Sequence, residues 1–415
     1  WEEKRRGERE RERERDKKDA EMDLERWDYV PDDGKGHSDS DWEEKRRKCN
    51  GRDDKVVQVH KRDGWEVEKE ERYRAGSLGK VLRGSCRSVE NYQRLNFIDE
   101  GTYGRVFRAR EISTGKLFAL KQVKLVNEKE GFPVTALREI NLLMGLSHEN
   151  LVWVREVVVG SSWDQVYMVM EYAEHDLKSV LDQMKAPYSQ AEIKCLMQQI
   201  LLGIQHMHDN WVLHRDLKTS NILLTAEGVV KLCDFGLARN YGDPPKNYTQ
   251  MVVTLWYRAP ELLLGADIYT PAIDMWAIGC IFAELLTLNP LIPGKSELDQ
   301  LDKMINLLGA PNEKSWPGLE SLPYVRRLRF KSQPYNYLRQ RFQPDPSRRT
   351  TMTALTAKGY DLLNSFLHYD PSKRITASEA LLHPYFSEAP PPVAPSLIQT
   401  FPDTHRAPAR RTRPG

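Results

Sequence analysis

The sequence predicts an α+β fold in two parts, a small strand-rich lobe followed by a larger helical lobe. Short apolar runs with turns between them occupy residues 92–173 and are typical of strands. Apolar residues then recur at helical spacing over residues 191–208, and a strongly apolar helix follows over 277–286. Between these helices, residues 213–236 carry polar groups at fixed offsets, joined by apolar runs.

Composition divides the chain into three segments. More than half of residues 1–87 are charged, with the two signs nearly balanced, so we expect a disordered tail, with a solvated Glu/Arg helix as the alternative. Residues 88–386 form the predicted folded domain, with a small lobe over 88–173 and a large lobe over 174–386. Residues 387–415 are a Pro-rich, basic tail, mostly extended or disordered, in which 395–401 are expected to pack on the large lobe.

Charge and cysteine content argue against several classes of protein. The net charge of +2 gives no overall attraction to nucleic acid or membranes. The five cysteines lack CxxC pairs, which argues against a zinc site or a disulfide framework and fits a reducing compartment. Because no apolar run approaches bilayer length and no signal peptide is evident, we expect no membrane association.

The stretch 213–236 carries the strongest chemical signal. Asp216, Asn221 and Asp234 are separated by apolar runs that predict a short hairpin, which brings the three side chains around one point. Carboxylate and amide oxygens are suitable ligands for Mg²⁺ shared with phosphates. A polar turn between two core strands is the alternative, and the fixed spacing argues against it.

A glycine loop and a lysine point to phosphate binding. Gly101 and Gly104 lie between the first two predicted strands, where backbone N–H groups can approach phosphate oxygens closely. The pattern GxGxxGxV is incomplete, because Asp99 occupies its first glycine. Alone, such a loop is more often an ordinary hairpin, but Lys121 in the next strand favours a nucleotide clamp in which it meets the α- and β-phosphates.

A helix is expected after this lysine strand, with Pro133 in its first turn. Its predicted inward face consists of four apolar residues: Val134, Leu137, Ile140 and Met144. Glu139 is expected to pair with Lys121, although an exposed helix carboxylate is the alternative. Because the pair depends on where the helix sits, this helix is a natural control point.

The motifs HRDLKTSN and DFG, in this order, resemble the catalytic and metal loops of protein kinases. The resemblance implies that Asp216 accepts the proton of a substrate hydroxyl and that Lys218 neutralises the transferring phosphoryl group. Lys218 is typical of serine/threonine kinases. His214 is expected to be a packed, hydrogen-bonded residue without a catalytic role. The implied ligands of Mg²⁺ are Asn221 and Asp234.

Positions along the chain assign an ATP site by the same resemblance. Met170 takes the gatekeeper position, the backbone of Glu171 and Ala173 contacts adenine, and Asp176 binds the ribose hydroxyls. The adenine walls, each of which could also be ordinary core, are assigned only as a set: Ile98, Val106, Ala119 and Leu223.

The segment between Asp234 and the APE motif is expected to be regulated by phosphorylation of Thr249. Guanidinium groups that could order the phosphorylated loop come from Arg138, Arg215 and Arg239.

Four further side chains have expected structural contacts. Thr254 is expected to bond Asp216 and Lys218, and Asp274 to brace the catalytic-loop backbone. A buried ion pair is expected between Glu261 and Arg374.

Residues 92–386 resemble a cyclin-dependent kinase throughout, and PVTALRE at 133–139 is close to the PITSLRE form that names one subgroup. Thr135-Ala136 departs from that form, and residues 343–358 form a longer loop than expected. The resemblance implies a bilobal protein-kinase fold that transfers phosphate from ATP to Ser or Thr followed by Pro. It implies an L-type cyclin on the 133–139 helix, and inhibitory phosphorylation of Thr102 and Tyr103.

It also implies a nuclear protein, with the cytoplasm as a second location, that acts in transcription and pre-mRNA splicing or in cell-cycle control. The run Lys45-Arg46-Arg47-Lys48 resembles a nuclear-import patch, and a plain solvated charge run is at least as good an interpretation. An RNA-binding tail is a third alternative, although the equal acidic charge would weaken its attraction to phosphate. Rival functions are a pseudokinase scaffold and a kinase of the MAP-kinase type, which carries a Thr-x-Tyr pair where this chain has Tyr248-Thr249. A third role, compatible with catalysis, is tethering to RNA-processing assemblies through the N-terminal tail.

Overall fold

The computed structural model describes residues 86–100, 104–123, 134–162, 165–242, 254–328, 330, 332–342, 354–399, 401–403 and 405. The chain divides into two units, Trp1–Arg72 and Tyr73–Gly415, and all the described residues belong to the second. Most of the predicted charged tail therefore lies outside the described residues. No helix within the described ranges has the length and apolar character needed to cross a membrane.

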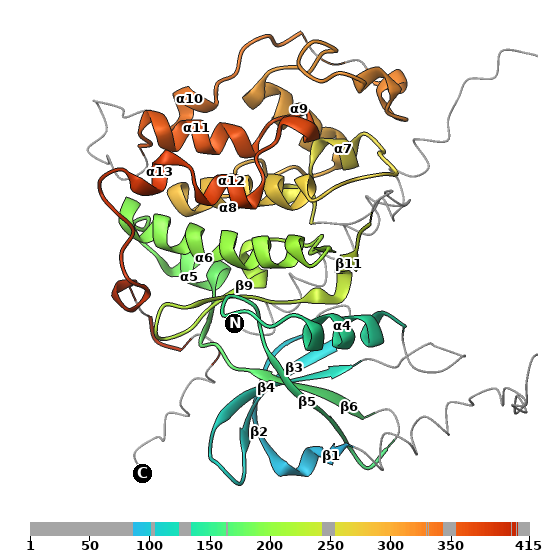
Figure 1. The fold of residues 1–415 in the computed structure, drawn as a ribbon, viewed down its shortest axis with the longest axis vertical. Coiled ribbons are helices and arrows are strands. Elements are labelled where there is room, and N and C mark those ends of the chain that lie inside the picture. Colours follow the sequence, from blue (N-terminus) through green and yellow to red (C-terminus); the bar gives the residue numbers. More distant parts are fainter. Residues whose placement is uncertain are drawn as a thin grey trace, which may run out of the picture. The chain divides into compact units, whose positions relative to one another are not determined.

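The small lobe is built on a six-stranded sheet in the order β1-β5-β6-β4-β3-β2. Figure 1 shows this sheet and the helix α4 on one side of the linker that follows β6, and the helical lobe on the other. The central strand β6 is almost wholly apolar and buried. In the edge strand β2, exposed residues alternate with partly buried ones over its second half. The strands are β1 (Arg87–Ser88), β2 (Tyr92–Glu100), β3 (Gly104–Glu111), β4 (Leu117–Val123), β5 (Val154–Val159) and β6 (Val166–Glu171).

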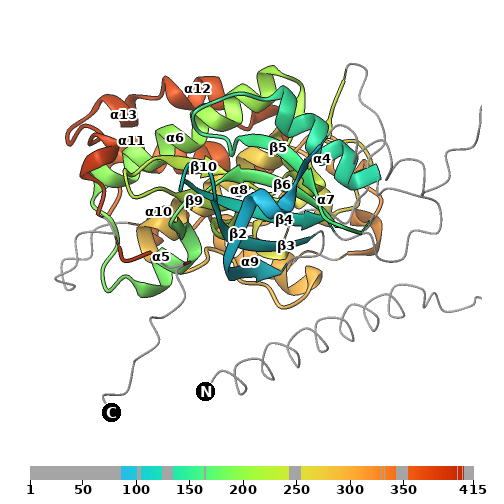
Figure 2. The same cartoon turned by 90° about the horizontal axis from the view of Figure 1, so that it is seen from below.

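Helix α4 (Val134–Gly145) packs against β5 and against the 3-10 turn η3 (Phe235–Leu237) of the large lobe. Figure 2 shows α4 alongside β5. The predicted inward face is wrong at two positions, because Leu137 is 44% and Met144 is 67% exposed. The buried apolar side chains are Ala136, Ile140 and Leu143. The apolar residues of α4 cover more of its circumference than one packing face, so spacing alone could not choose between the two stripes.

The large lobe is organised around α8 (Ala272–Thr287), in which almost every residue is buried. A helix that is apolar on all sides belongs in the centre of a lobe, and α8 contacts α6 and α11. The helix α6 begins at a capping box formed by Ser189 and Glu192, so local sequence stabilises its N-terminal end. The other helices are α5 (Leu177–Gln183), α6 (Gln190–Asp209), α7 (Pro260–Leu263), α9 (Glu297–Leu308), α10 (Leu338–Arg341), α11 (Ala357–Phe366), α12 (Ala377–Leu381) and α13 (Pro384–Ser387).

Two small sheets position the functional loops. One has the order β10-β9-β7 and the other pairs β11 with β8. The antiparallel hairpin of β9 and β10 is the one predicted within residues 213–236, and it pairs Ile222 with Leu232. The short strands are β7 (His175–Asp176), β8 (Val212–Leu213), β9 (Ile222–Leu224), β10 (Val230–Leu232) and β11 (Arg239–Asn240).

The C-terminal part of the chain returns to the large lobe. The turn η9 (Pro395–Leu397) packs on α6, and Ile398 is 3% exposed, so the predicted packing of this segment is confirmed. The loop predicted over 343–358 ends earlier than expected. Its residues 343–353 lie outside the described residues, but Thr356 caps α11 by accepting a hydrogen bond from the Gly359 N–H, so the last two residues are helical.

Candidate active site

The catalytic loop is held by a carboxylate from the central helix of the large lobe. Asp274 on α8 accepts hydrogen bonds from the backbone N–H groups of His214 and Arg215, both at 2.9 Å, and its Oδ2 lies 3.0 Å from His208 Nε2. Burial alone would raise the pKa of Asp274, but the hydrogen bonds and the nearby histidines lower it. The bracing role predicted for Asp274 is confirmed.

This brace holds a strained backbone. Arg215 has a φ of 65° and Asp234 a φ of 62°, in the left-handed region that non-glycine residues rarely adopt. Such strain persists only where the surroundings fix it, and it concentrates at functional sites. His214 is buried, its Nε2 lies 3.0 Å from the Cys233 carbonyl oxygen, and its ring packs on Phe235, which is the packed role predicted from the sequence.

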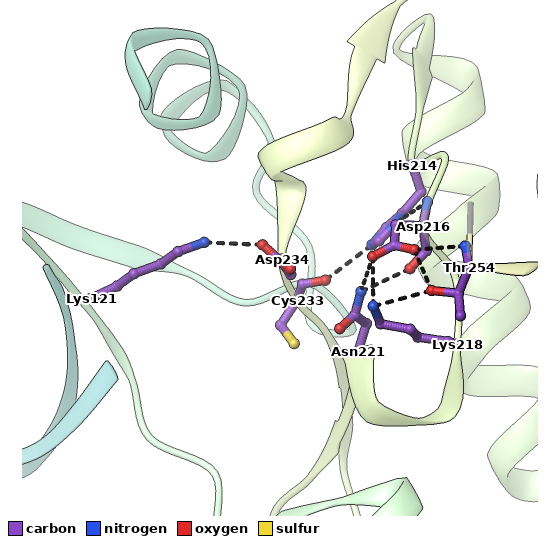
Figure 3. Close-up of polar contacts among 8 residues, drawn as sticks. All are labelled: Lys121, His214, Asp216, Lys218, Asn221, Cys233, Asp234 and Thr254. Atoms are coloured by element: carbon purple, nitrogen blue, oxygen red, sulfur yellow. Dashed lines mark hydrogen bonds and ion pairs between the residues drawn. The ribbon is translucent and has the colours of Figure 1, made fainter. Parts of the chain in front are cut away.

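Asp216 lies at the centre of a hydrogen-bond network (Figure 3). Thr254 donates to its Oδ1 from both the backbone N and Oγ1, at 3.2 and 3.0 Å. Its Oδ2 lies 2.9 Å from Lys218 Nζ and accepts a 3.1 Å hydrogen bond from Asn221 Nδ2. Lys218 also donates to Thr254 Oγ1 at 3.3 Å, so the contacts predicted for Thr254 are confirmed. The network fixes a carboxylate that is 8% exposed.

Asn221 and Asp234 were predicted to hold Mg²⁺, and both offer oxygen atoms that a hard cation prefers. The amide nitrogen of Asn221 donates to Asp216, which turns the amide oxygen of Asn221 away from Asp216 (Figure 3). The Asp234 side chain is 36% exposed, whereas Asn221 is buried. Within the described ranges, no group of three or more His, Cys, Asp or Glu residues could hold a metal ion. The donor set of amide and carboxylate oxygens fits Mg²⁺, which keeps waters and phosphate oxygens among its ligands.

Lys121 joins the two lobes at this site. Its Nζ lies 2.6 Å from Glu139 Oε1 on α4 and 3.0 Å from Asp234 Oδ1, which precedes η3. Burial would lower the pKa of Lys121, but the attraction of Glu139 and Asp234 outweighs burial and raises it. The pKa of Asp234 is lowered, because Lys121 outweighs the effect of burial. The predicted pair of Lys121 and Glu139 is therefore formed in the structure.

The residues assigned to adenine lie on four strands, β2, β3, β4 and β9. Ala119 on β4 pairs in register with Met170 on β6, and Leu223 on β9 pairs with Asp176 on β7. Ile98, Val106, Ala119 and Leu223 are all partly buried, whereas core neighbours such as Leu120 are fully buried. Partial burial is expected for residues that line an open site, and ordinary core residues are more completely covered.

Asp176 and Ala173 have partners in the structure that the sequence did not predict. Asp176 Oδ1 accepts a hydrogen bond from the Ser179 N–H as the N-cap of α5, and its Oδ2 lies 3.4 Å from His405 Nε2. The Ala173 carbonyl oxygen lies 3.0 Å from His405 Nδ1. Nothing in the sequence around His405 distinguishes it as a site residue, because a single histidine in a Pro-rich tail carries no periodicity.

The three predicted phosphate-binding arginines lie close to one another. Arg215 is buried and donates to the Leu237 carbonyl oxygen and to Tyr269 Oη, both at 2.7 Å. The pKa of Arg138 is lowered, first by burial and then by repulsion from Arg239 and Arg215. Such a concentration of positive charge suits a phosphate group. Thr249 itself lies outside the described residues, as do Gly101, Thr102 and Tyr103.

Gly104 is required by strand packing as well as by the predicted close approach of its backbone to a phosphate. A Cβ at this position would lie 2.4 Å from the Gln122 carbonyl oxygen, so the pairing of β3 with β4 excludes a side chain there. The sequence argument assigned this glycine to nucleotide binding alone, and strand packing gives a second cause.

Two buried hydrogen-bond networks lie in the large lobe that carries the catalytic loop. Arg374 donates to both carboxylate oxygens of Glu261, at 2.7 and 3.0 Å, which confirms the predicted ion pair. The second network was not predicted: Glu284 on α8 accepts hydrogen bonds from Tyr257 Oη at 2.7 Å and from Thr219 Oγ1 at 3.2 Å. The available signal was an acidic residue inside an otherwise apolar helix.

Comparison with known families is consistent with this geometry. The protein kinase domain model matches residues 92–386, which is most of the chain. A small sheet, a control helix and a helical lobe, with the lysine–glutamate pair between them, are the parts of that fold described above. The chain belongs to the protein kinase family.

Similar proteins narrow the family further. The chain is 56% identical over 333 residues to "Cyclin-dependent kinase G-2" of Oryza sativa subsp. indica, covering 80% of this chain and 46% of that protein. It is 55% identical over 322 residues to "Cyclin-dependent kinase 11B" of Rattus norvegicus, covering 78% of this chain and 72% of that protein. It is 50% identical over 336 residues to "Serine/threonine-protein kinase PITSLRE" of Drosophila melanogaster, covering 79% and 34%.

Within the protein kinases, the chain thus belongs to the cyclin-dependent serine/threonine kinases of the PITSLRE type. It spans less than half the length of the rice relative.

Proposed function

We propose that the chain transfers the γ-phosphate of ATP to Ser or Thr followed by Pro in protein substrates, after activation by a cyclin. The observation that carries this proposal is the position of Lys121, with its Nζ 2.6 Å from Glu139 and 3.0 Å from Asp234. This arrangement brings together the phosphate-binding lysine, the control helix and the metal-binding carboxylate that phosphoryl transfer requires. It also argues against a pseudokinase, since each of these groups is present and engaged.

Each polar side chain has a distinct role in the proposed reaction. Asp216, fixed by Thr254 and Asn221, orients the substrate hydroxyl and accepts its proton. Lys218, 2.9 Å from Asp216, neutralises charge on the transferring phosphoryl group. Lys121 binds the α- and β-phosphates. Asn221 and Asp234 would hold Mg²⁺, which supplies neutralisation of the phosphate charge.

The cyclin is proposed to dock on α4, and an L-type cyclin is the expected kind. The support is the exposed apolar stripe of Leu137 and Met144, which are 44% and 67% exposed on the helix that carries Glu139. A partner that covers this stripe would hold the exposed face of α4, while Lys121 holds Glu139 on its buried face. Exposed apolar side chains gathered on one helix mark an interaction surface.

Phosphorylation of Thr249 is proposed as the second activating event. Its support is the cluster of Arg138, Arg215 and Arg239, in which burial, and then repulsion from the other two arginines, lowers the pKa of Arg138. A phosphate relieves that repulsion and ties α4 to the catalytic loop. Inhibitory phosphorylation of Thr102 and Tyr103 remains a proposal from the sequence.

We further propose a nuclear protein, with the cytoplasm as a second location, that acts in transcription, pre-mRNA splicing or cell-cycle control. The mixed-charge residues 1–87 are proposed to tether it to RNA-processing assemblies. Deletion of these residues should then relocate the protein without changing its phosphorylation of a peptide, and unchanged localisation would count against the tether.

The reaction is tested by transfer of labelled phosphate to a Ser-Pro peptide in the presence of Mg²⁺ and an L-type cyclin. The variant Asp234→Asn should abolish transfer, whereas Asp209→Asn, an exposed carboxylate at the end of α6, should leave it unchanged. A chain that binds ATP but labels no Ser-Pro peptide under these conditions overturns the proposal, and so does full activity of the Asp234 variant.

A further inference from the structure

The C-terminal chain is anchored on the large lobe before it reaches the linker between the lobes. The Val393 N–H donates to the Ala191 carbonyl oxygen at 3.2 Å, and Ile398 is buried. The backbone of Pro395 passes so close to Gly228 that a Cβ on that glycine would lie 1.9 Å from the Pro395 oxygen. The residues that follow this anchor and contact the linker are the tail segment, defined here as Phe401, Pro402, Asp403 and His405.

Asp403 binds the linker and the small lobe. Tyr172, which directly follows β6 and Glu171, donates from Oη to both carboxylate oxygens of Asp403, at 2.9 and 3.0 Å. Arg108 on β3 lies 3.5 Å from Asp403 and stacks over the Tyr172 ring. Burial raises the pKa of Tyr172, and Asp403 raises it further, so the phenol remains a donor to this carboxylate.

His405 extends these contacts across both lobes. Its backbone oxygen accepts a 2.8 Å hydrogen bond from Asn96 Nδ2 on β2. Its ring reaches the Ala173 carbonyl oxygen with Nδ1, at 3.0 Å, and Asp176 Oδ2 with Nε2, at 3.4 Å. The tail segment thus contacts the small lobe, the linker and the first residues of the large lobe.

The contact with Asp176 bears on nucleotide binding. Asp176 Oδ1 is engaged by the Ser179 N–H as a helix cap, which leaves Oδ2 as the oxygen for a second donor. His405 Nε2 lies against that oxygen, and the Asp176 side chain is only 18% exposed. Ribose hydroxyls that bind Asp176 must approach the same oxygen.

We propose that His405 competes with the ribose hydroxyls of ATP for Asp176, so that the docked tail segment weakens nucleotide binding. The inference rests on the role of Asp176 in the proposed function. His405 acts here through Asp176 and takes no part in phosphoryl transfer. When the ribose occupies Asp176, the imidazole is displaced.

The charges around His405 support the contact. Burial lowers the pKa of His405, but the hydrogen bonds to Asp176 and Ala173 and the attraction of Asp176 and Asp403 outweigh burial and raise it. A raised pKa favours the imidazolium, which binds a carboxylate more strongly than the neutral ring does.

The test compares binding of ATP and 2′,3′-dideoxy-ATP to the full chain by displacement of a fluorescent nucleotide. His405→Ala should tighten ATP binding by about 3- to 10-fold, the worth of one such hydrogen bond, and leave dideoxy-ATP unchanged. Pro402→Ala, an exposed residue of the same segment, is the matched control and should change neither. In peptide phosphorylation, the His405 variant should have a lower KM for ATP and an unchanged kcat.

Three results overturn the inference. Weaker ATP binding in His405→Ala means that the tail segment contributes to the nucleotide site. Unchanged ATP binding means that His405 does not reach the ribose position. Equal tightening of ATP and dideoxy-ATP places the competition away from Asp176. Failure of the unaltered chain to bind any ATP is distinguishable from all three, and it removes the proposed function together with the inference.

Discussion

Lys121 on β4 and Glu139 on α4 form a buried ion pair, with Nζ and Oε1 2.6 Å apart and with both residues less than 10% exposed. The same ammonium group reaches Asp234 at 3.0 Å, so the position of a small-lobe helix and that of the metal loop are coupled through one side chain. Any event that moves α4 therefore acts directly on the lysine that is proposed to bind the ATP phosphates and on the carboxylate that is proposed to hold Mg²⁺.

Glu139→Gln should reduce the catalytic rate far more than it reduces nucleotide binding. The amide keeps the shape of the carboxylate but leaves the buried Lys121 ammonium without its strongest partner. Loss of one preorganised electrostatic group typically lowers kcat by about 10²- to 10³-fold. Steady-state kinetics on a Ser-Pro peptide measures the effect, with the exposed Glu90→Gln as the control. A kcat close to that of the unaltered chain would show that the pair is only structural.

Asp274→Asn should loosen the catalytic loop. An asparagine cannot accept from both N–H groups and from His208 as a carboxylate does, so at least one of these donors loses its partner. Leaving a buried donor unsatisfied costs roughly 1–3 kcal/mol. Thermal unfolding should show the lower stability, and peptide phosphorylation should fall with it. Normal stability in the variant would contradict the bracing role.

Because the pKa of Asp274 is lowered, the difference in stability between the unaltered chain and Asp274→Asn should depend on pH. A carboxyl group whose folded-state pKa is depressed contributes stability above its unfolded pKa, about 3.9, and loses that contribution as the pH falls through the folded value. The stability gap between the unaltered chain and Asp274→Asn should therefore be constant near neutral pH and narrow below about pH 4. Denaturant titrations at several pH values measure it, and a gap that widens in acid would contradict the assignment.

Arg374→Lys should destabilise the large lobe even though it conserves the charge. The guanidinium bonds both oxygens of Glu261 and also the Ala272 carbonyl oxygen, a fork that an ammonium group cannot reproduce. Removal of one partner of a buried ion pair lowers the free energy of unfolding by roughly 3–5 kcal/mol. The loss in Arg374→Lys should be smaller than that, because the charge is kept. Differential scanning calorimetry is the measurement, and Lys373→Arg next to it, which is largely exposed, is the control. An unchanged melting temperature would show that the fork is dispensable.

Leu137→Asp combined with Met144→Asp should remove activation by the cyclin but preserve the fold. Leu137 is 44% and Met144 is 67% exposed, so the fold should be preserved, with a change in stability of about 1 kcal/mol or less. ATP binding by the isolated chain should be unchanged, while peptide phosphorylation should no longer respond to added cyclin. A normal response would place the cyclin surface elsewhere on the chain.

Local sequence patterns predicted the strands, the β9–β10 hairpin and several polar contacts. These predictions succeeded because each rests on a local sequence pattern. The strand with Lys121 precedes an amphipathic helix that carries Glu139. Asp274 lies near the start of a strongly apolar helix. The buried face of α4 could not be chosen correctly, because Leu137 is apolar and yet 44% exposed. The spacing of apolar residues does not say which of two stripes meets the core.

The contacts of the C-terminal segment could not be predicted for a different reason. Asp403 and His405 bind groups more than 200 residues earlier in the chain, and no local propensity encodes such pairing. The Glu284 network has the same non-local origin, since Tyr257 and Thr219 come from separate loops. Only the burial of an acid within the apolar helix α8 could have indicated that partners must exist.

The most direct test of the central claim is phosphate transfer from ATP to a Ser-Pro peptide, measured with and without an L-type cyclin and compared with Thr249→Ala. The proposed function predicts strong transfer only when the cyclin is present, and a large loss in Thr249→Ala, since the cluster of Arg138, Arg215 and Arg239 then has no phosphate to bind. Equal transfer without any cyclin and without Thr249 would contradict the account, because the helix carrying Glu139 would then need neither partner.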